Sequence, residues 1–426
     1  MALTRTPVTT DPQQAAEVSA PEARIETPAG PNGPSHEVSR RSFLHRGAVA
    51  GGTALVVVTG GVGYRAYDEG VFQVGQGGAY EAWRSWNQQR GPMALVAAAI
   101  LAANPHNTQA WIFRVSPQRI DLFADRSRNI GAVDPFRREM YVGLGCAIEN
   151  LILAAGPNGY QTKLTLLPTP GQPVHAAAIE LSRGPVRRPE LYAQIPNRHT
   201  DRTAYQLRPV PTAAQRAMSA LAADLPDTGL HWITGATERG QIGALMVAAA
   251  QALTEDRQQS VDDNRWFRHD WDAIQRLKDG LTIDAQGLPA LTSTLAKLIP
   301  ATSRQYNDNF WVNHTRDPQA RTAAAYGIIS VPDAQNDHHR LNGGRLLERI
   351  HLWTAGHGLS LGHMNQITER ADRERQLGAT PTFGNATREL VTARGTEQLV
   401  AFRIGYPATG DGRRLSPRRP TTEVTR

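Results

Sequence analysis

The chain has 426 residues, a formal net charge of +7 and one cysteine, Cys146, so it contains no internal disulfide. Its length allows two ordinary domains or one large one. The excess positive charge lies in an N-terminal segment and in a C-terminal tail, and no run interleaves basic and aromatic residues. Composition therefore argues against a nucleic-acid partner.

The N-terminal region reads as an export signal. Residues 1–38 lack apolar periodicity, and we expect them to be disordered. Arg40 and Arg41 then precede an uncharged, glycine-rich stretch, which is typical of a twin-arginine signal read by the Tat translocation machinery. We assign 39–66 to this signal and expect an exported, periplasmic or membrane-anchored protein. The membrane anchor is an option because no small-x-small cleavage site follows the stretch. A chance basic pair before a buried helix is the alternative.

The region 67–194 predicts a first folded half. A helix begins at Pro92 and ends before Asn104-Pro105. Residues 111–115 and 119–123 predict a hairpin, and apolar positions at helical spacing predict a helix around Cys146. Strands are expected near 163–167 and 175–181.

The region 195–407 predicts a second half in which helix, strand and long helix recur in a similar order. Strands are expected at 230–234, 326–331 and 398–407, and an apolar face predicts a helix at 345–355. The irregular stretch 266–303 could form a lid. His338 and His339 before Asn342-Gly-Gly predict a solvated turn, and 408–426 reads as a basic, disordered tail with five arginines and, from Asp411 on, two acidic residues.

Arg403 lies in an otherwise apolar strand, between Phe402 and Ile404. Burying a guanidinium without a partner costs several kcal/mol. We therefore expect an anion to meet Arg403, with Glu369 or Asp372 as alternative structural partners.

Two polar segments are candidate binding motifs. Arg198-His-Thr-Asp-Arg202 places two guanidinium groups around the Thr200 hydroxyl, a set that suits a phosphate monoester, although a solvated loop would look the same. His106-Asn107-Thr-Gln109 lies between a helix and a strand. Its amides offer both donors and acceptors, as the pyrimidine edge of a flavin requires.

Together these segments resemble the flavin-dependent nitroreductases, specifically their Acg-like branch. The resemblance covers roughly Trp83 to Pro407. The segment from Asn104 to Trp111 is similar to the family's Pro-Ser-x-x-Asn-x-Gln-Pro-Trp motif, although Ala110 replaces its proline. The segment 198–202 is similar to the family's phosphate-gripping motif, and Gly358–Gln366 to the loop near the flavin ring.

The resemblance implies an α+β fold of the nitroreductase type, a three-layer α/β/α sandwich. The arginine motif follows the Asn-x-Gln motif here, the reverse of the family's order, so we expect two halves fused as an intramolecular pseudo-dimer with one FMN per chain. Expected phosphate ligands are Arg198, Thr200, Arg202 and Arg403. Expected ring contacts are His106, Asn107, Gln109, Met364 and Asn365.

The implied function is that of an exported FMN oxidoreductase, a monomer or weak dimer, acting on a small-molecule acceptor such as a nitroaromatic or a quinone. No residue stands out as the acid or base. NAD(P)H is scarce outside the cytoplasm, so a membrane quinol or another donor would have to feed it. The alternative is a non-catalytic protein that sequesters FMN. No histidine spacing matches a zinc site, so no metal is expected.

Overall fold

The computed structural model describes residues 68, 70–300, 302–390, 395–408 and 414–426. All of them belong to one compact unit. The expected disordered stretch 1–38 and the expected export signal 39–66, with Arg40 and Arg41, lie outside the described residues.

The first half builds one antiparallel sheet of four strands in the order β1-β2-β4-β3. The expected hairpin is confirmed, since Trp111 pairs with Ala124 and Ser116 with Arg119. The long helix around Cys146 is also confirmed and packs on this sheet. The elements are α2 (Glu81–Ser85), α3 (Pro92–Ala99), β1 (Trp111–Ser116), β2 (Arg119–Ala124), α4 (Arg138–Ala155), β3 (Tyr160–Leu166) and β4 (His175–Arg183).

The second half builds its own antiparallel sheet, in the order β5-β8-β10-β9. Its strands are β5 (Gly229–Ile233), β8 (Ala325–Val331), β9 (Ser360–His363) and β10 (Glu397–Gly405), and the pair β6 (Phe267–Arg268) and β7 (Leu281–Thr282) is separate and parallel. Its helices are α5 (Thr212–Ala220), α6 (Ala236–Glu255), α7 (Arg257–Asn264), α8 (Trp271–Leu277), α9 (Ala290–Leu298), α10 (Arg304–His314), α11 (Asp337–Gly356), α12 (Gln366–Leu377), α13 (Thr382–Leu390) and α14 (Thr421–Val424).

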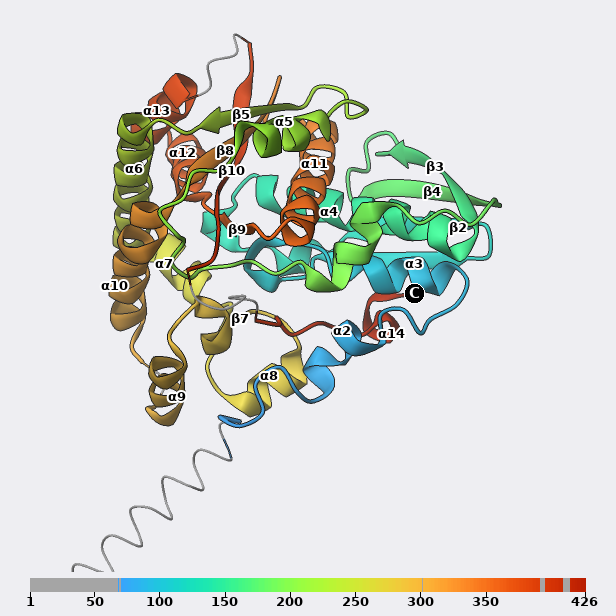
Figure 1. Cartoon of the computed structure of the whole chain (residues 1–426), viewed down its shortest axis with the longest axis horizontal. Helices are drawn as coiled ribbons and strands as arrows, with labels where there is room; N and C mark the ends of the chain where they lie inside the picture. Colours follow the sequence, from blue (N-terminus) through green and yellow to red (C-terminus); the bar gives the residue numbers. More distant parts are fainter. Residues whose placement is uncertain (1–67, 69, 301, 391–394, 409–413) are drawn as a thin grey trace, which may run out of the picture. The chain divides into compact units, whose positions relative to one another are not determined.

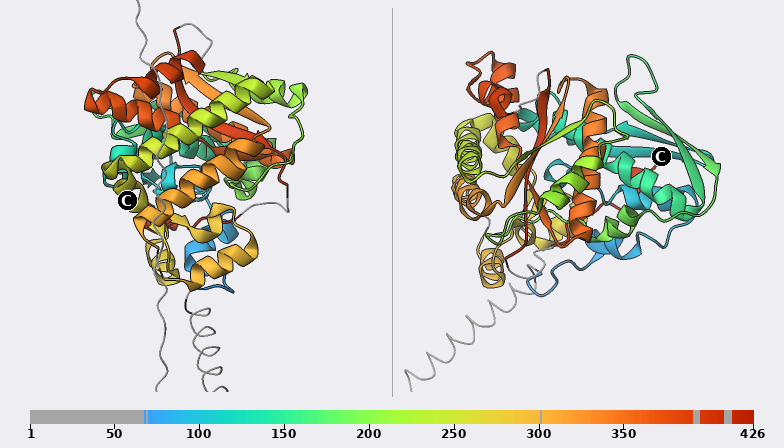
Figure 2. Two further views of the ribbon diagram at one scale, coloured as in Figure 1. Left: turned by 90° about the vertical axis from the view of Figure 1, so that its left-hand side faces the viewer. Right: turned by 45° about the horizontal axis from the view of Figure 1, so that its top comes forward.

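Strand β8 shows how the second sheet is covered on both faces. Tyr326 and Ile328 pack in a core with side chains of α6 and α12, whereas Ile329 and Val331 belong to the core that α11 and α4 share. Side chains alternate along a strand, so every residue of β8 is buried. This half is a three-layer α/β/α arrangement, and Figure 2 shows its helices on either side of the sheet. The expected α+β class with two halves is confirmed.

The two halves meet where α4 crosses α11 (Figure 1). A Cβ on Gly145 would lie 2.2 Å from the Leu341 carbonyl oxygen, and one on Gly344 would lie 2.1 Å from the Val142 carbonyl oxygen. Only glycine allows this approach. The turn expected at 338–344 is therefore wrong: these residues form the first turns of α11, and the glycine pair marks a helix contact rather than a break.

The C-terminal segment is ordered where the structure describes it, contrary to the disordered tail expected for 408–426. Arg418 and Val424 are 3% and 1% exposed. The Arg426 amide donates to the Phe113 carbonyl (2.8 Å), and Thr425 forms a parallel bridge with the same residue. The segment thus packs on the first half although it follows the second. Its polar composition misled the sequence prediction because its backbone and arginines find buried partners.

One helix among the described residues, Arg138–Asn158, is long and apolar enough to cross a bilayer by composition, but 78% of its most apolar window is buried inside the fold. It is the helix that carries Cys146 against the first sheet, so its apolar character is explained by the core it occupies.

Candidate functional site

A cavity of about 300 Å³ is lined by side chains from both halves. Its size falls within the range of small-molecule sites. Six of the nine residues expected to bind a flavin line it: His106, Asn107, Arg198, Thr200, Arg202 and Asn365. The expected lid stretch contributes apolar wall, including Phe267, Leu281 and Ile283.

Gln109, Met364 and Arg403 do not line this cavity, so the structure does not bring all nine together. Gln109 is fully buried; its Nε2 donates to the Lys278 carbonyl (2.8 Å) and its Oε1 accepts from the Arg419 amide (2.8 Å). Met364 packs in the apolar core beneath α6 and α12. As placed here, neither side chain can touch a ring in the cavity.

Arg403 is fully buried, but neither of the two carboxylates proposed as partners meets it. Its guanidinium donates to the carbonyls of Gln319 (3.3 Å), Asp201 (3.2 Å) and Thr203 (2.7 Å), and it lies 4.0 Å from the centre of the Tyr205 ring. Asp372 instead pairs with Arg138, at 2.8 Å. Arg403 therefore supplies charge near the cavity without contacting its contents.

The turn that carries His106, Asn107 and Gln109 is strained. All three residues have positive φ angles, of 47°, 54° and 53°. Strain of this kind persists only where the surroundings fix it. Here Asn107 Nδ2 donates to the carbonyls of Pro417 (2.8 Å) and Gly280 (3.2 Å), so the turn ties the C-terminal segment to the cavity wall.

Four arginines form what we call the basic cluster: Arg198, Arg202, Arg403 and Arg418. Arg198 Nε lies 3.3 Å from Glu348 Oε1 without hydrogen-bond geometry, and its Nη2 donates to the Leu101 carbonyl (2.9 Å). Arg418 donates to the side-chain oxygen of Asn107 and to the Ala102 carbonyl (3.3 Å). The Nε atoms of Arg198 and Arg418 are buried and lack hydrogen-bond partners.

The basic cluster is short of negative charge. Its four guanidinium groups face two buried carboxylates, Glu348 and Asp201, which leaves two positive charges. Burial and the neighbouring Arg198 hold the pKa of Arg418 well below its usual range. Burial and Arg403 lower the pKa of Arg202 to about 10. Both lowered pKa values show that these two charged guanidinium groups are destabilised here, and a nearby anion would stabilise them.

The positive charge of the basic cluster also lowers the pKa values of two neighbouring histidines. Burial, Arg198 and Arg202 lower the pKa of His363 to about 3, and burial and Arg198 hold that of His351 well below normal. Both imidazoles are therefore neutral at pH 7. His363 lines the cavity and can offer a neutral donor or acceptor there.

A second part of the wall is acidic. Glu139 and Glu369 are 5% and 6% exposed and line the cavity. His106 Nε2 lies 2.5 Å from Asp263 Oδ1, and although burial lowers the pKa of His106, Asp263 raises it further, so the net shift is upward. This pair places a hydrogen-bonded imidazole and carboxylate at the cavity wall, and the carboxylate favours the protonated imidazole.

Sequence reasoning missed Arg418 and Glu139 as lining residues, and it included His363 only as part of the loop 358–366 expected near the flavin ring. The sequence predicts a basic, disordered tail around Arg418, because composition alone reports no burial. Glu139 lies in the first turn of α4, where an acidic residue is ordinarily explained by the helix dipole. Among the residues that the structure describes, no group of three or more His, Cys, Asp or Glu side chains could hold a metal ion.

Comparisons with known proteins find relatives over part of the chain. No family model matches it. A Mycobacterium tuberculosis protein named "Putative NAD(P)H nitroreductase Rv3131" is 34% identical over 131 residues, which are 30% of this chain and 38% of that protein. The M. tuberculosis "Putative NAD(P)H nitroreductase acg" is 30% identical over 87 residues, 20% of this chain and 26% of that protein.

Solved structures are similar only weakly. The FMN-dependent nitroreductase NfnB of Mycobacterium smegmatis, in complex with NADPH, covers 56% of this chain and 97% of its own, at 17% identity and a TM-score of 0.35. A nitroreductase with bound FMN from Desulfitobacterium hafniense gives 12% identity over 56% of this chain and 97% of that chain, with a TM-score of 0.33. TM-scores of this size are too low to support an inference about this chain. The sequence comparisons show that part of the chain is similar to mycobacterial proteins named NAD(P)H nitroreductases, Acg among them, and that the match spans less than half of their length.

Proposed function

We propose that this protein is an FMN-binding oxidoreductase of the nitroreductase type, which passes electron pairs to a small-molecule acceptor such as a nitroaromatic or a quinone. The observation that carries the proposal is the surplus of two positive charges in the basic cluster, three of whose arginines line a cavity of about 300 Å³. A phosphate monoester carries about −1.5 to −2 at pH 7 and would balance that surplus.

The residues present fit FMN. The guanidinium groups of Arg198 and Arg418 and the hydroxyl of Thr200 would hold the phosphate, with Arg202 beside them. His106 and Asn365 would meet the polar edge of the ring. When bound, the flavin supplies hydride or electron-pair transfer through N5, and the protein orients it and excludes water.

FMN should bind this protein about 100-fold more tightly than riboflavin, which lacks the phosphate. Two charge-assisted hydrogen bonds at about 1.5 kcal/mol each give that ratio. Fluorescence titration of the cofactor-free protein with each flavin measures it, and adenosine monophosphate, with the phosphate but another ring, serves as the competitor. Equal affinities for the two flavins would show that the basic cluster does not bind the phosphate.

The names of the relatives favour a reductase over a protein that only sequesters FMN. Turnover separates the two. A yellow protein that reduces menadione or a nitroarene with NAD(P)H or a quinol supports the reductase. A yellow protein that dithionite bleaches, but neither donor does, supports the sequestering protein.

We also propose export by the Tat pathway, which the order Arg40-Arg41-Ser-Phe-Leu supports. Changing both arginines to lysine keeps the charge and should retain the protein in the cytoplasm, as fractionation of the exporting cell would show. A matched change of Arg5 and Arg24, outside the motif, should leave export intact. Export of the twin-lysine variant at the normal level would refute the signal.

A further inference from the structure

Glu139 on α4 and Glu369 on α12 bring two carboxyl groups together at the cavity wall. Both side chains are more than nine-tenths buried, and they lie within hydrogen-bond reach of one another. Glu139 Oε1 is buried, makes no hydrogen bond and lies 3.5 Å from Arg138 Nη2. Two carboxyl groups in contact away from water cannot both be ionised at little cost, so a proton between them satisfies both.

The groups around the pair do not supply enough positive charge to remove that proton. Arg138 Nη2 lies 3.5 Å from Glu139 Oε1, but its Nε bonds to Asp372 at 2.8 Å. Asp134, before α4, accepts from the amides of Glu139 (3.1 Å) and Met140 (3.0 Å).

The remaining charged neighbours are Asp263 on α7 with its partner His106, and Arg202 beyond them. Burial and Glu139 hold the pKa of Glu369 well above its usual range, and burial and Glu139 raise that of Asp134 to about 6.

We propose that Glu139 and Glu369 share one proton at neutral pH and donate it to the molecule that is reduced in the cavity. The step rests on the proposed function, whose reduced flavin is the hydride donor. An acceptor that gains a hydride carries one extra negative charge on an oxygen or nitrogen atom. The carboxyl O–H bond breaks, the proton bonds to that atom, and the carboxylate pair regains a proton from solvent. Charge and atoms balance over the cycle.

The shared proton can be tested on the cofactor-free protein by infrared spectroscopy. The wild type should show the C=O stretch of a protonated, buried carboxyl group at pH 7, and Glu369→Gln and Glu139→Gln should each lose it. Glu374→Gln is the matched control, because Glu374 is also buried but caps α13 through the amides of Phe383 and Gly384 and does not line this cavity. Absence of the band in the wild type would overturn the proposal.

Donation is tested by the pH profile of the loaded enzyme. Since the protonated pair is the active form, kcat should fall as pH rises through the raised pKa, and Glu369→Gln should lower kcat about 100-fold with KM and FMN affinity unchanged. Glu369→Asp, which keeps the acid, should recover part of the rate, and Glu139→Gln gives the same readout if Glu369→Gln does not fold. A wild-type kcat and pH profile in these variants would refute donation. A protein that shows the band but binds no FMN would instead refute the proposed function.

Discussion

Replacing Arg198 by lysine should weaken FMN binding about 10- to 100-fold while the chain still folds. Lysine keeps the charge opposite Glu348, which avoids leaving that buried carboxylate alone, but it loses the planar fork that binds a phosphate bidentately. One to two lost charge-assisted bonds at about 1.5 kcal/mol each give this range. Fluorescence titration with FMN measures it, and binding of riboflavin should change much less.

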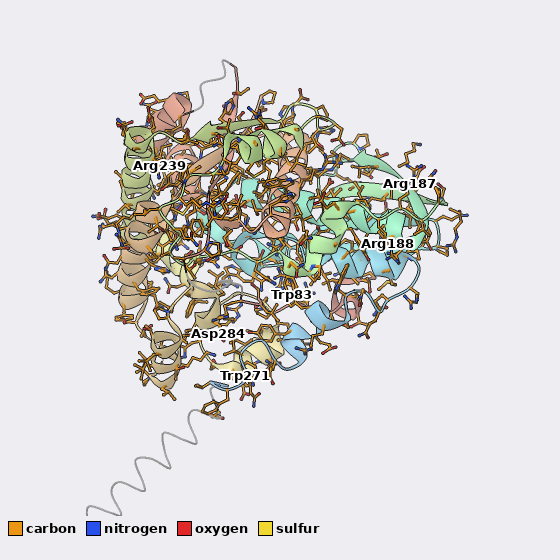
Figure 3. The ribbon with its side chains drawn as sticks, viewed as in Figure 1. Trp83, Arg187, Arg188, Arg239, Trp271 and Asp284 are labelled. Atoms are coloured by element: carbon orange, nitrogen blue, oxygen red, sulfur yellow. The ribbon has the colours of Figure 1, made fainter. Side chains whose placement is uncertain are left out.

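The control is Arg188→Lys, at an exposed arginine that does not line the cavity; Figure 3 labels it together with Trp83, the ring over which Arg418 packs. It should leave FMN affinity unchanged. An Arg198→Lys protein that binds FMN as tightly as the wild type would show that Arg198 does not bind the phosphate. The surplus positive charge of the basic cluster would then not mark the phosphate site.

The second large effect is on stability. Gly344→Ala should lower the free energy of unfolding by about 3 kcal/mol, because the new Cβ would lie 2.1 Å from the Val142 carbonyl oxygen and would push α4 and α11 apart. Denaturant unfolding followed by circular dichroism measures the loss. FMN affinity should fall with it, since the two helices carry cavity walls from both halves.

Gly240→Ala is the matched change for this stability measurement. Gly240 is an exposed helical glycine in α6 with nothing within 4 Å of the added Cβ, so alanine should stabilise the protein by up to about 1 kcal/mol. If Gly344→Ala were as harmless as Gly240→Ala, the close approach of the two helices would not exist in solution.

Much of the fold could be predicted because its elements are locally encoded. The β1–β2 hairpin has alternating apolar residues around a Ser-Pro-Gln turn, and the Cys146 helix has its apolar face at helical spacing. Gly343 and Gly344 misled for a physical reason. Glycine disfavours a helix locally, but it is required where a second backbone comes within van der Waals distance. The partner here is distant in sequence: Cys146 Sγ donates to the Gly344 carbonyl, 198 positions along the chain.

The site was less predictable because it is built from non-local contacts. Arg198, Arg202 and His106 could be recognised as candidate ligands within short segments. For Gln109 and Arg403 the sequence indicated only that a polar side chain needs a partner. Which partner meets each depends on tertiary structure: Gln109 holds the backbone of Arg419, and Arg403 holds three carbonyls. Glu139 and Glu369 are 230 positions apart, so no motif could join them.

The C-terminal segment has a consequence for biosynthesis. Residues 414–426 leave the ribosome after both halves, yet they carry Arg418 into the cavity and pair with Phe113 in the first half. Domains generally fold as they emerge during translation. Here, however, the two sheets can form while the cavity still lacks one of its cations. Tight capture of an anion in the cavity would therefore follow the folding of both sheets, because it depends on the docking of residues 414–426.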